Sequence, residues 1–248
     1  MTNNITLIAS NELRRFFKSP LAWIILGIIQ FLVAIFFYVP LVIYLQPSSA
    51  ATGLTDAVVS TMYGFTAYTI LIISPLLTMR LISEEHQLGT IKLLFSSPIS
   101  ITEMVLGKFL GIIIFYLLIL LMVTLMPLSL LIGTQLDLGQ MLSSLVGLFL
   151  LMTSIASIGL FLSSLTNSPT IAAINTLGVS LFLIVVKIGE TSSTSSVASI
   201  FSYLSIDKHY NSFLSGLFNS VDIFYYIILT TFFIILCIWR LDAERTYG

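Results

Sequence analysis

Few side chains in this sequence have the types and spacing that chemistry requires. The two histidines, His86 and His209, are far apart in the chain, and the single cysteine, Cys237, has no second cysteine to pair with. The G-x-x-x-x-G-K-[ST] phosphate loop is absent, as are the H-E-x-x-H zinc motif and the G-x-S-x-G nucleophile motif. The sequence therefore predicts no catalytic residue, no metal site and no cofactor bound by this chain.

The polar stretch RLISEEHQLGTIKLLFSSPIS, residues 80–100, is the most specific feature of the chain. Gly89 is suited to the end of one helix and Thr90 to the cap of the next, which predicts a short helix over residues 91–96. Pro98 should stop that helix, because the residue before a proline disfavours helical geometry.

Ser100 and Glu103 have the spacing of a capping box, which predicts that a new helix begins there. An ordinary connection between bundle helices is about 2–8 residues long, so this longer and helical connection favours a protein-docking segment over a plain loop.

Composition indicates the environment of these residues. Of the 248 residues, 57% are hydrophobic and 8% are charged, whereas a soluble domain carries about 25% charged residues. The continuous apolar runs predict an all-α polytopic membrane protein with a single transmembrane domain over residues 1–248. Six runs approach the about 20 residues of a spanning helix: 21–45, 58–79, 109–132, 141–162, 170–188 and 223–239. The first is longer than the apolar core of a signal peptide, so we interpret it as a retained span.

Positive charges predict the orientation, because Lys and Arg gather in cytoplasmic loops. With both termini in the cytoplasm, the cytoplasmic residues are Arg14, Arg15, Lys18, Arg80, Lys92, Lys108, Arg240 and Arg245, and the external ones are Lys187 and Lys208. The sequence therefore predicts a multi-pass protein of the bacterial cytoplasmic membrane with both termini inside.

Two further helical patterns concern packing. Ile5, Ala9, Leu13 and Phe16 share one face of a helix before the first span, which predicts an amphipathic helix on the cytoplasmic membrane surface; a poorly ordered tail is the alternative. Small residues at four-residue spacing in the fifth run allow close helix approach, either within the chain or at a candidate subunit interface. These residues are Ala172, Thr176 and Ser180.

The polar segment resembles the coupling region of ABC-2-type transporter permeases. The resemblance lies in Met79-Arg80, Glu84-Glu85, Gly89-Thr90, Leu93-Leu94, Ser97-Pro98-Ile99-Ser100 and Gly107-Lys108. It implies that the short helix is a coupling helix, which docks on a separate cytoplasmic ATPase. The residues expected to dock are Glu84, Glu85, Gly89, Thr90, Ile91, Leu93, Leu94, Phe95 and Pro98.

A second segment, between the last two apolar runs, resembles the outer-face signature of gliding-motility GldF-like and NosY-like permeases. The signature residues are His209, Gly216 and Asp222, with Tyr210 where Phe is commoner. The resemblance therefore assigns the chain to this subgroup.

The leading hypothesis is the permease subunit of an ATP-binding cassette exporter. It implies a dimer, formed with a second copy or a related permease, and a dimeric ATPase partner that binds ATP and Mg²⁺. The alternative is a membrane anchor through which the ATPase acts on an extracytoplasmic machine, with an auxiliary protein as a further partner and no solute flux. Lipid surrounds the chain in either case, and nothing suggests nucleic acid. A secondary transporter is disfavoured, because the middles of the spans lack charged residues.

Overall fold

The computed structural model describes residues 2–46, 53–96, 99–185 and 205–247. These residues form helices, with no strand among them. The elements are α1 (Thr2–Lys18), α2 (Pro20–Tyr44), η1 (Thr55–Ser60), α3 (Thr61–Thr78), α4 (Ser83–Gln87), α5 (Ile91–Ser96), α6 (Ile101–Leu130), α7 (Leu138–Ser164), α8 (Pro169–Val185), α10 (Ile206–Leu214) and α11 (Ser220–Tyr247).

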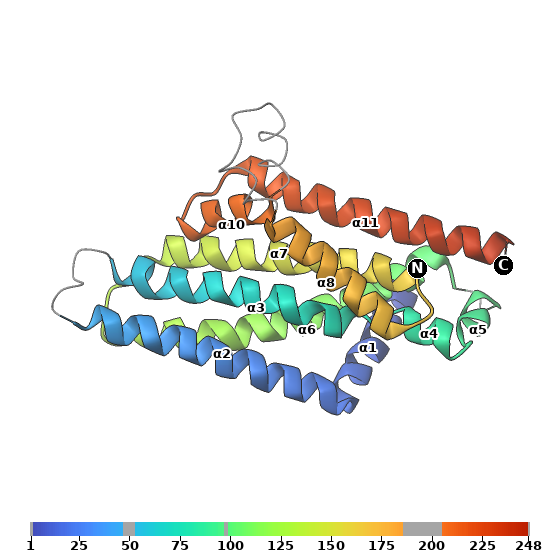
Figure 1. Ribbon diagram of the computed structural model, residues 1–248, viewed down its shortest axis with the longest axis horizontal. Helices are drawn as coiled ribbons and strands as arrows, with labels where there is room; N and C mark the ends of the chain where they lie inside the picture. Colours follow the sequence, from blue (N-terminus) through green and yellow to red (C-terminus); the bar gives the residue numbers. More distant parts are fainter. Residues whose placement is uncertain (1, 47–52, 97–98, 186–204, 248) are drawn as a thin grey trace.

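The long helices form a bundle whose axes run roughly along the molecule, with α1, α4, α5 and both termini at one end and α10 at the other (Figure 1). Seven of the eight cations predicted to be cytoplasmic lie in or beside α1, α4, α5 and the last part of α11, and the eighth, Lys108, lies in the second turn of α6. We call this end of the bundle the cation-rich end.

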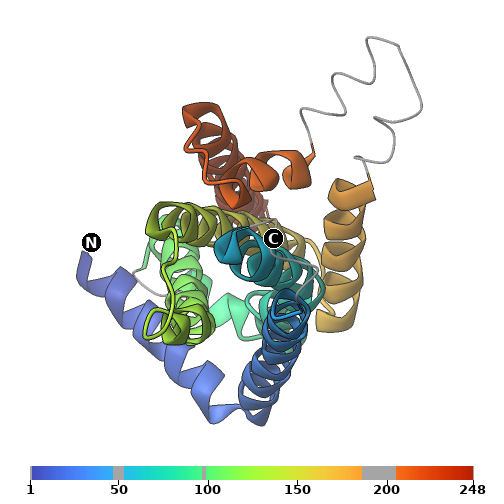
Figure 2. The ribbon, with the colours of Figure 1, turned by 90° about the vertical axis from the view of Figure 1, so that its left-hand side faces the viewer.

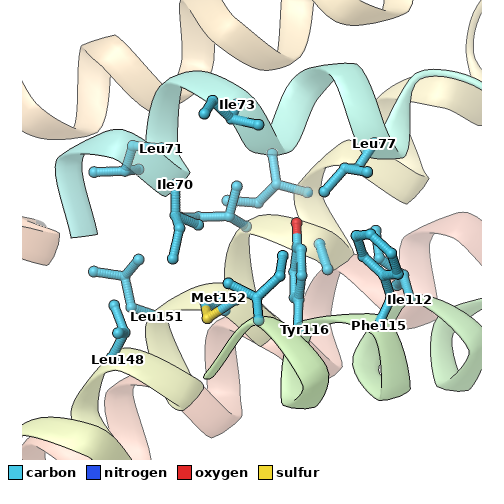
Figure 3. Packing of buried hydrophobic residues seen from close by; sticks show 14 of the residues in the cluster. Ile70, Leu71, Ile73, Leu77, Ile112, Phe115, Tyr116, Leu148, Leu151 and Met152 are labelled. Atoms are coloured by element: carbon cyan, nitrogen blue, oxygen red, sulfur yellow. The ribbon is translucent and has the colours of Figure 1, made fainter. Parts of the chain in front are cut away.

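Helix α7 occupies the middle of the bundle and packs against α3, α6, α8, α10 and α11, as the end-on view also indicates (Figure 2). Its central position suits a helix with many small residues, since Gly147 and Gly159 lie against side chains of α10 and α3 that a Cβ atom would displace. The core between α3, α6 and α7 is mainly apolar (Figure 3), and it also contains a hydrogen bond between the Ser74 and Tyr116 hydroxyls.

Five helical segments are long and apolar enough to cross a membrane: 20–44, 55–87, 101–130, 138–164 and 220–246. They correspond to five of the six predicted spans. The remaining one, 170–188, falls on α8, an apolar helix of 17 residues. Its predicted end lies outside the described residues, so the sixth span stays a prediction.

Local capping explains where several helices begin. The Ser100 hydroxyl accepts from the Glu103 backbone, and the Glu103 carboxylate accepts from the Ser100 backbone, which confirms the predicted capping box. Asp137 caps α7 in a similar way, because its carboxylate accepts from the backbone N–H groups of Gly139 and Gln140.

Helix α1 packs against α6 instead of standing apart from the bundle. Ala9 is buried, and the Phe16 ring stacks on Phe115 of α6 with centroids 5.2 Å apart. The predicted apolar face of α1 therefore covers another helix, and the position of α1 at a membrane surface stays a prediction.

Candidate functional site

The polar segment between α3 and α6 folds into two short helices at the cation-rich end (Figure 1). Gly89 adopts φ +70°, the left-handed geometry that glycine tolerates best, and the chain reverses there between α4 and α5. Thr90 contributes to the same turn, since its hydroxyl donates to the Glu85 carbonyl at 3.4 Å. The predicted helix over residues 91–96 is thereby observed as α5.

Helix α5 has one buried side and one exposed side. Ile91 is buried, and Leu94 and Phe95 are partly buried against the core. Leu93 points away and is 72% exposed, and Leu88, just before the turn, is 67% exposed. Two large apolar side chains therefore lie uncovered on a polar, turn-rich segment, whereas Pro98 lies outside the described residues.

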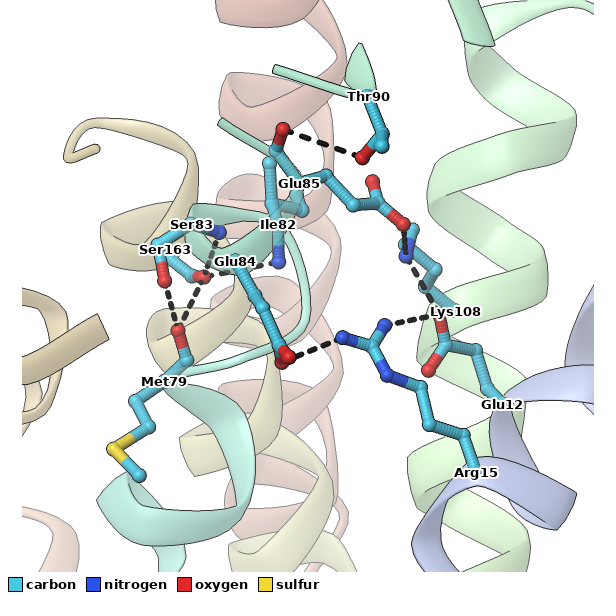
Figure 4. A network of polar contacts seen from close by, with 10 residues as sticks. All are labelled: Glu12, Arg15, Met79, Ile82, Ser83, Glu84, Glu85, Thr90, Lys108 and Ser163. Carbon is cyan, nitrogen blue, oxygen red and sulfur yellow. Dashed lines mark hydrogen bonds and ion pairs between the residues drawn. The ribbon is translucent and has the colours of Figure 1, made fainter. Parts of the chain in front are cut away.

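Serine 163 of α7 fixes the start of α4 (Figure 4). Its hydroxyl accepts from the backbone N–H groups of Ile82 and Ser83 at 3.1 and 3.0 Å, and donates to the Met79 carbonyl at 3.0 Å. One side chain of the central helix thus satisfies backbone groups that α3 leaves unpaired where it ends and α4 begins.

Glu84 and Glu85 turn inward onto α1 and α6, where they join a network of ion pairs (Figure 4). The Lys108 ammonium, 2% exposed, lies 2.6 Å from Glu12 Oε1 and 2.5 Å from Glu85 Oε1. The Arg15 guanidinium lies 2.5 Å from Glu84 Oε2 and 3.7 Å from Glu12 Oε1. The carboxylates predicted for docking therefore bind within the chain, with Glu84 the more exposed of the two.

A further polar contact reaches the last helix, because His86 Nδ1 lies 3.4 Å from Glu244 Oε1. Helix α4, only five residues long, thus has a polar contact to each of four helices: α1 through Glu84, α6 through Glu85, α7 through Ser83 and α11 through His86. The network also encloses a cavity of about 210 Å³ that Leu94 and Phe95 of α5 help to line. Helix α5 therefore borders the same polar network that joins α4 to its neighbours.

Three partners of this segment, Glu12, Ser163 and Glu244, were not predicted from the sequence. Glu12 had a detectable signal, since it lies within the face of α1 otherwise occupied by apolar residues. Ser163 and Glu244 had none, because a serine near a helix end and an acidic residue near a terminus are ordinary.

The candidate subunit-interface residues are buried inside the chain. Ala172, Thr176 and Ser180 have at most 1% exposure, and α8 packs against α3 and α7. Their small size thus allows close helix packing within the chain, in line with the alternative interpretation, and a role at a subunit interface stays a prediction.

The predicted outer-face residues come together at the end of the bundle opposite α5. His209 of α10 lies 2.6 Å from Asp222 of α11, measured from Nδ1 to Oδ1, and its ring stacks on Tyr225. Gly216 adopts φ +78° in the turn between these helices, with Gln140 packed against it. The three residues therefore fasten α10 to the start of α11.

Tyrosine side chains join the same cluster to α3. The Tyr68 hydroxyl donates to Asp207 at 2.5 Å, and the Tyr210 hydroxyl donates to the Tyr63 carbonyl at 3.0 Å. Burial raises the pKa of Tyr210 well above its ordinary value, so this hydroxyl keeps its proton and its donor role. In residues 2–46, 53–96, 99–185 and 205–247, no group of three or more His, Cys, Asp or Glu residues could hold a metal ion.

The bundle of long apolar helices, with a polar helical segment fixed at its cation-rich end, is typical of a multi-pass membrane protein. The model of the ABC-2 family transporter proteins matches residues 6–244, so the chain belongs to that family. It is therefore a membrane permease component of an ABC system, a class whose ATPase motifs reside in other subunits. None of the curated proteins compared with the chain matches it significantly.

Proposed function

We propose that this chain is the permease subunit of an ABC exporter and that α5, with the turn before it, docks on a separate cytoplasmic ATPase. The observation that carries the proposal is the pair of uncovered leucines, Leu88 and Leu93, on a segment whose other side is fixed to the bundle. Exposed apolar side chains next to polar surface are typical of protein contacts.

The contacts of α4 supply a route for coupling. A helix fastened by ion pairs and a serine cap to four neighbours moves with them, so force applied to α5 would act on α1, α6, α7 and α11 together. ATP and Mg²⁺ belong to the partner ATPase, and this chain contributes the docking surface and the pathway through the membrane.

The same proposal includes the orientation and the assembly. The cation-rich end faces the cytoplasm, which the positive-inside tendency favours. A second copy or a related permease completes the pathway, since five or six helices of one chain pack around a filled core. The signature residues His209, Gly216 and Asp222 support assignment to the gliding-motility-like subgroup, since His209 contacts Asp222 and Gly216 forms the turn between their helices.

Replacing Leu93 by glutamate tests the docking surface. A charge buried in the interface without a partner should reduce the ATPase that co-purifies with the chain by about tenfold or more, since such burial costs several kcal/mol. The ATPase is the one that co-purifies with the wild-type chain in detergent. Its amount and its stimulated activity are measured in preparations of the variant and of the wild type.

Leu217→Glu is the matched control, because Leu217 is 64% exposed and follows α10 at the opposite end. It should leave co-purification unchanged. Full retention of a stimulated ATPase by Leu93→Glu would contradict the docking assignment.

A further inference from the structure

A groove of about 470 Å³ lies where α1, the start of α2 and the end of α3 meet. It is therefore at the end of two helices that are long and apolar enough to span the membrane. Trp23 of α2 lies nearby and is 60% exposed, with its indole N–H donating to the Phe17 carbonyl at 3.0 Å. Because tryptophan gathers at membrane–water boundaries, the groove lies at the level expected of lipid headgroups.

Positive charge exceeds negative charge in this groove. Its charged lining consists of Arg14, Arg15, Lys18, Arg80, Glu12 and Glu84. Both carboxylates already hold a cation, since Arg15 pairs with Glu84 and Lys108 pairs with Glu12.

The other three cations, Arg14, Lys18 and Arg80, are exposed and form no ion pair with any residue of the described ranges. Two cations of α1 and one that follows α3 thus line one groove, and none of the three has an ionic partner within the part of the chain that the structure describes.

The other walls of the groove are apolar and lead onto the outer surface of the bundle. Leu76 of α3 lines the groove and is 43% exposed, and Ile72 one turn earlier is also exposed. On α2, Ile24 and Ile28 continue the same kind of surface. A ligand with an anionic head and long apolar chains would match both parts, whereas a peptide or a free anion would use only the first.

We propose that this groove binds an anionic phospholipid, with the phosphate held by Arg14, Lys18 and Arg80 and the acyl chains lying along α2 and α3. Arginine guanidinium groups suit phosphate oxygens because they can donate two parallel hydrogen bonds. Basic pockets between membrane helices on the cytoplasmic side recognise such headgroups. The inference rests on the membrane-embedded permease proposed above, but its test needs no ATPase.

Trp23 provides the probe, because the chain has two tryptophans and Trp239→Phe leaves Trp23 alone. The purified variant is placed in phosphatidylcholine vesicles that contain brominated phosphatidylglycerol or brominated phosphatidylcholine, since bromine quenches a nearby indole. Quenching of Trp23 should show a preference of at least about fivefold for the anionic lipid, the effect of one well-placed cation.

Arg14→Gln/Lys18→Gln/Arg80→Gln, made in the Trp239→Phe background, should abolish this preference. The matched control, Lys92→Gln/Arg240→Gln/Arg245→Gln, removes the same charge from the same end and should retain it. Arg80→Gln alone should weaken the preference for the anionic lipid about fivefold. Because Arg80 is exposed, this single variant provides the test if the triple variant does not fold.

A preference that survives in the groove variant, or that the control loses equally, would overturn the inference. Reversal of the quenching by excess inorganic phosphate would assign the groove to a free anion instead and would also overturn it. Equal quenching by both lipids refutes this inference alone, whereas no quenching by either would refute the membrane-embedded function.

Discussion

A lysine side chain that is almost fully buried needs partners for its charge, because an unpaired ammonium in the interior costs several kcal/mol. Lys108 has two partners, Glu12 from α1 and Glu85 from α4. Each contact joins separate elements, so this single residue connects α1, α4 and α6. The carboxylates predicted for docking thus have partners within the chain, whereas the leucines proposed for docking are exposed.

Lys108→Met should destabilise the protein by about 3–5 kcal/mol, because it leaves Glu12 and Glu85 buried beside each other without their cation. Arg15, 3.7 Å from Glu12, offsets part of this loss. The measurement is the free energy of unfolding in detergent, obtained by titration with a denaturant.

The triple variant Lys108→Met/Glu12→Gln/Glu85→Gln removes all three charges and should recover much of the stability. Lys92→Met is the matched control, since Lys92 is exposed and should tolerate the change. Equal stability of the single and triple variants would contradict the role of charge burial.

Local signals at single residues could be predicted from the sequence, and long-range partners could not. Gly89 and the Ser100–Glu103 pair act within a few residues, so their types already imply a turn and a cap. The partners of Lys108 are 96 and 23 positions away, and only the packing of α1 and α4 onto α6 brings them together.

At the scale of helices, α1 and α6 approach each other closely through two glycines. A Cβ atom at Gly107 would lie 2.7 Å from Ile8 Cβ, and one at Gly111 would lie 2.8 Å from Glu12 Cβ. The G-x-x-x-G spacing lets two backbones come together in a membrane protein. The sequence predicted the amphipathic pattern of α1 correctly, but the pattern does not distinguish a helix partner from a lipid surface.

Gly107→Ala and Gly27→Ala provide a matched test of this contact. Nothing lies within 4 Å of an added Cβ at Gly27, so that change should stabilise α2 by up to about 1 kcal/mol through helix propensity. At Gly107 the added methyl meets Ile8, and the overpacking should cost about 1–3 kcal/mol.

The measurement is the free energy of unfolding of both variants, with limited proteolysis of α1 as a second readout. Gly107→Ala should expose α1 to protease, and Gly27→Ala should not. Equal stability gains in the two variants would mean that α1 does not rest on α6.

The helix α8 marks the limit of prediction at this scale. Residues 170–188 read as a span because they are apolar, yet the described helix has 17 residues and carries buried Thr176 and Ser180 on its inner face. Hydropathy counts apolar residues without regard to the length of the helix or to which face packs inward. It therefore predicts an apolar helix here but not whether that helix crosses the membrane.

In the molecule as a whole, both tryptophans lie toward the same end of the bundle as most of the cations. Trp23 near the start of α2 and Trp239 near the end of α11 are both exposed, and both lie toward the cation-rich end. Tryptophan is typical of both boundaries of a membrane, and an excess of cations beyond one boundary is typical of the cytoplasmic side. The contacts within the chain do not depend on which side faces the cytoplasm, so orientation needs its own experiment.

Single cysteines at the two ends test that orientation. Lys92→Cys places an exposed thiol on α5, and Ser215→Cys places one just after α10 at the opposite end. The native Cys237 is buried, so it should stay unlabelled in both variants. With the cation-rich end in the cytoplasm, a membrane-impermeant maleimide should label Ser215→Cys in intact spheroplasts and Lys92→Cys only after permeabilisation. The reverse pattern would place the docking segment outside, where no ATP is available, and would contradict the proposed function at its first step.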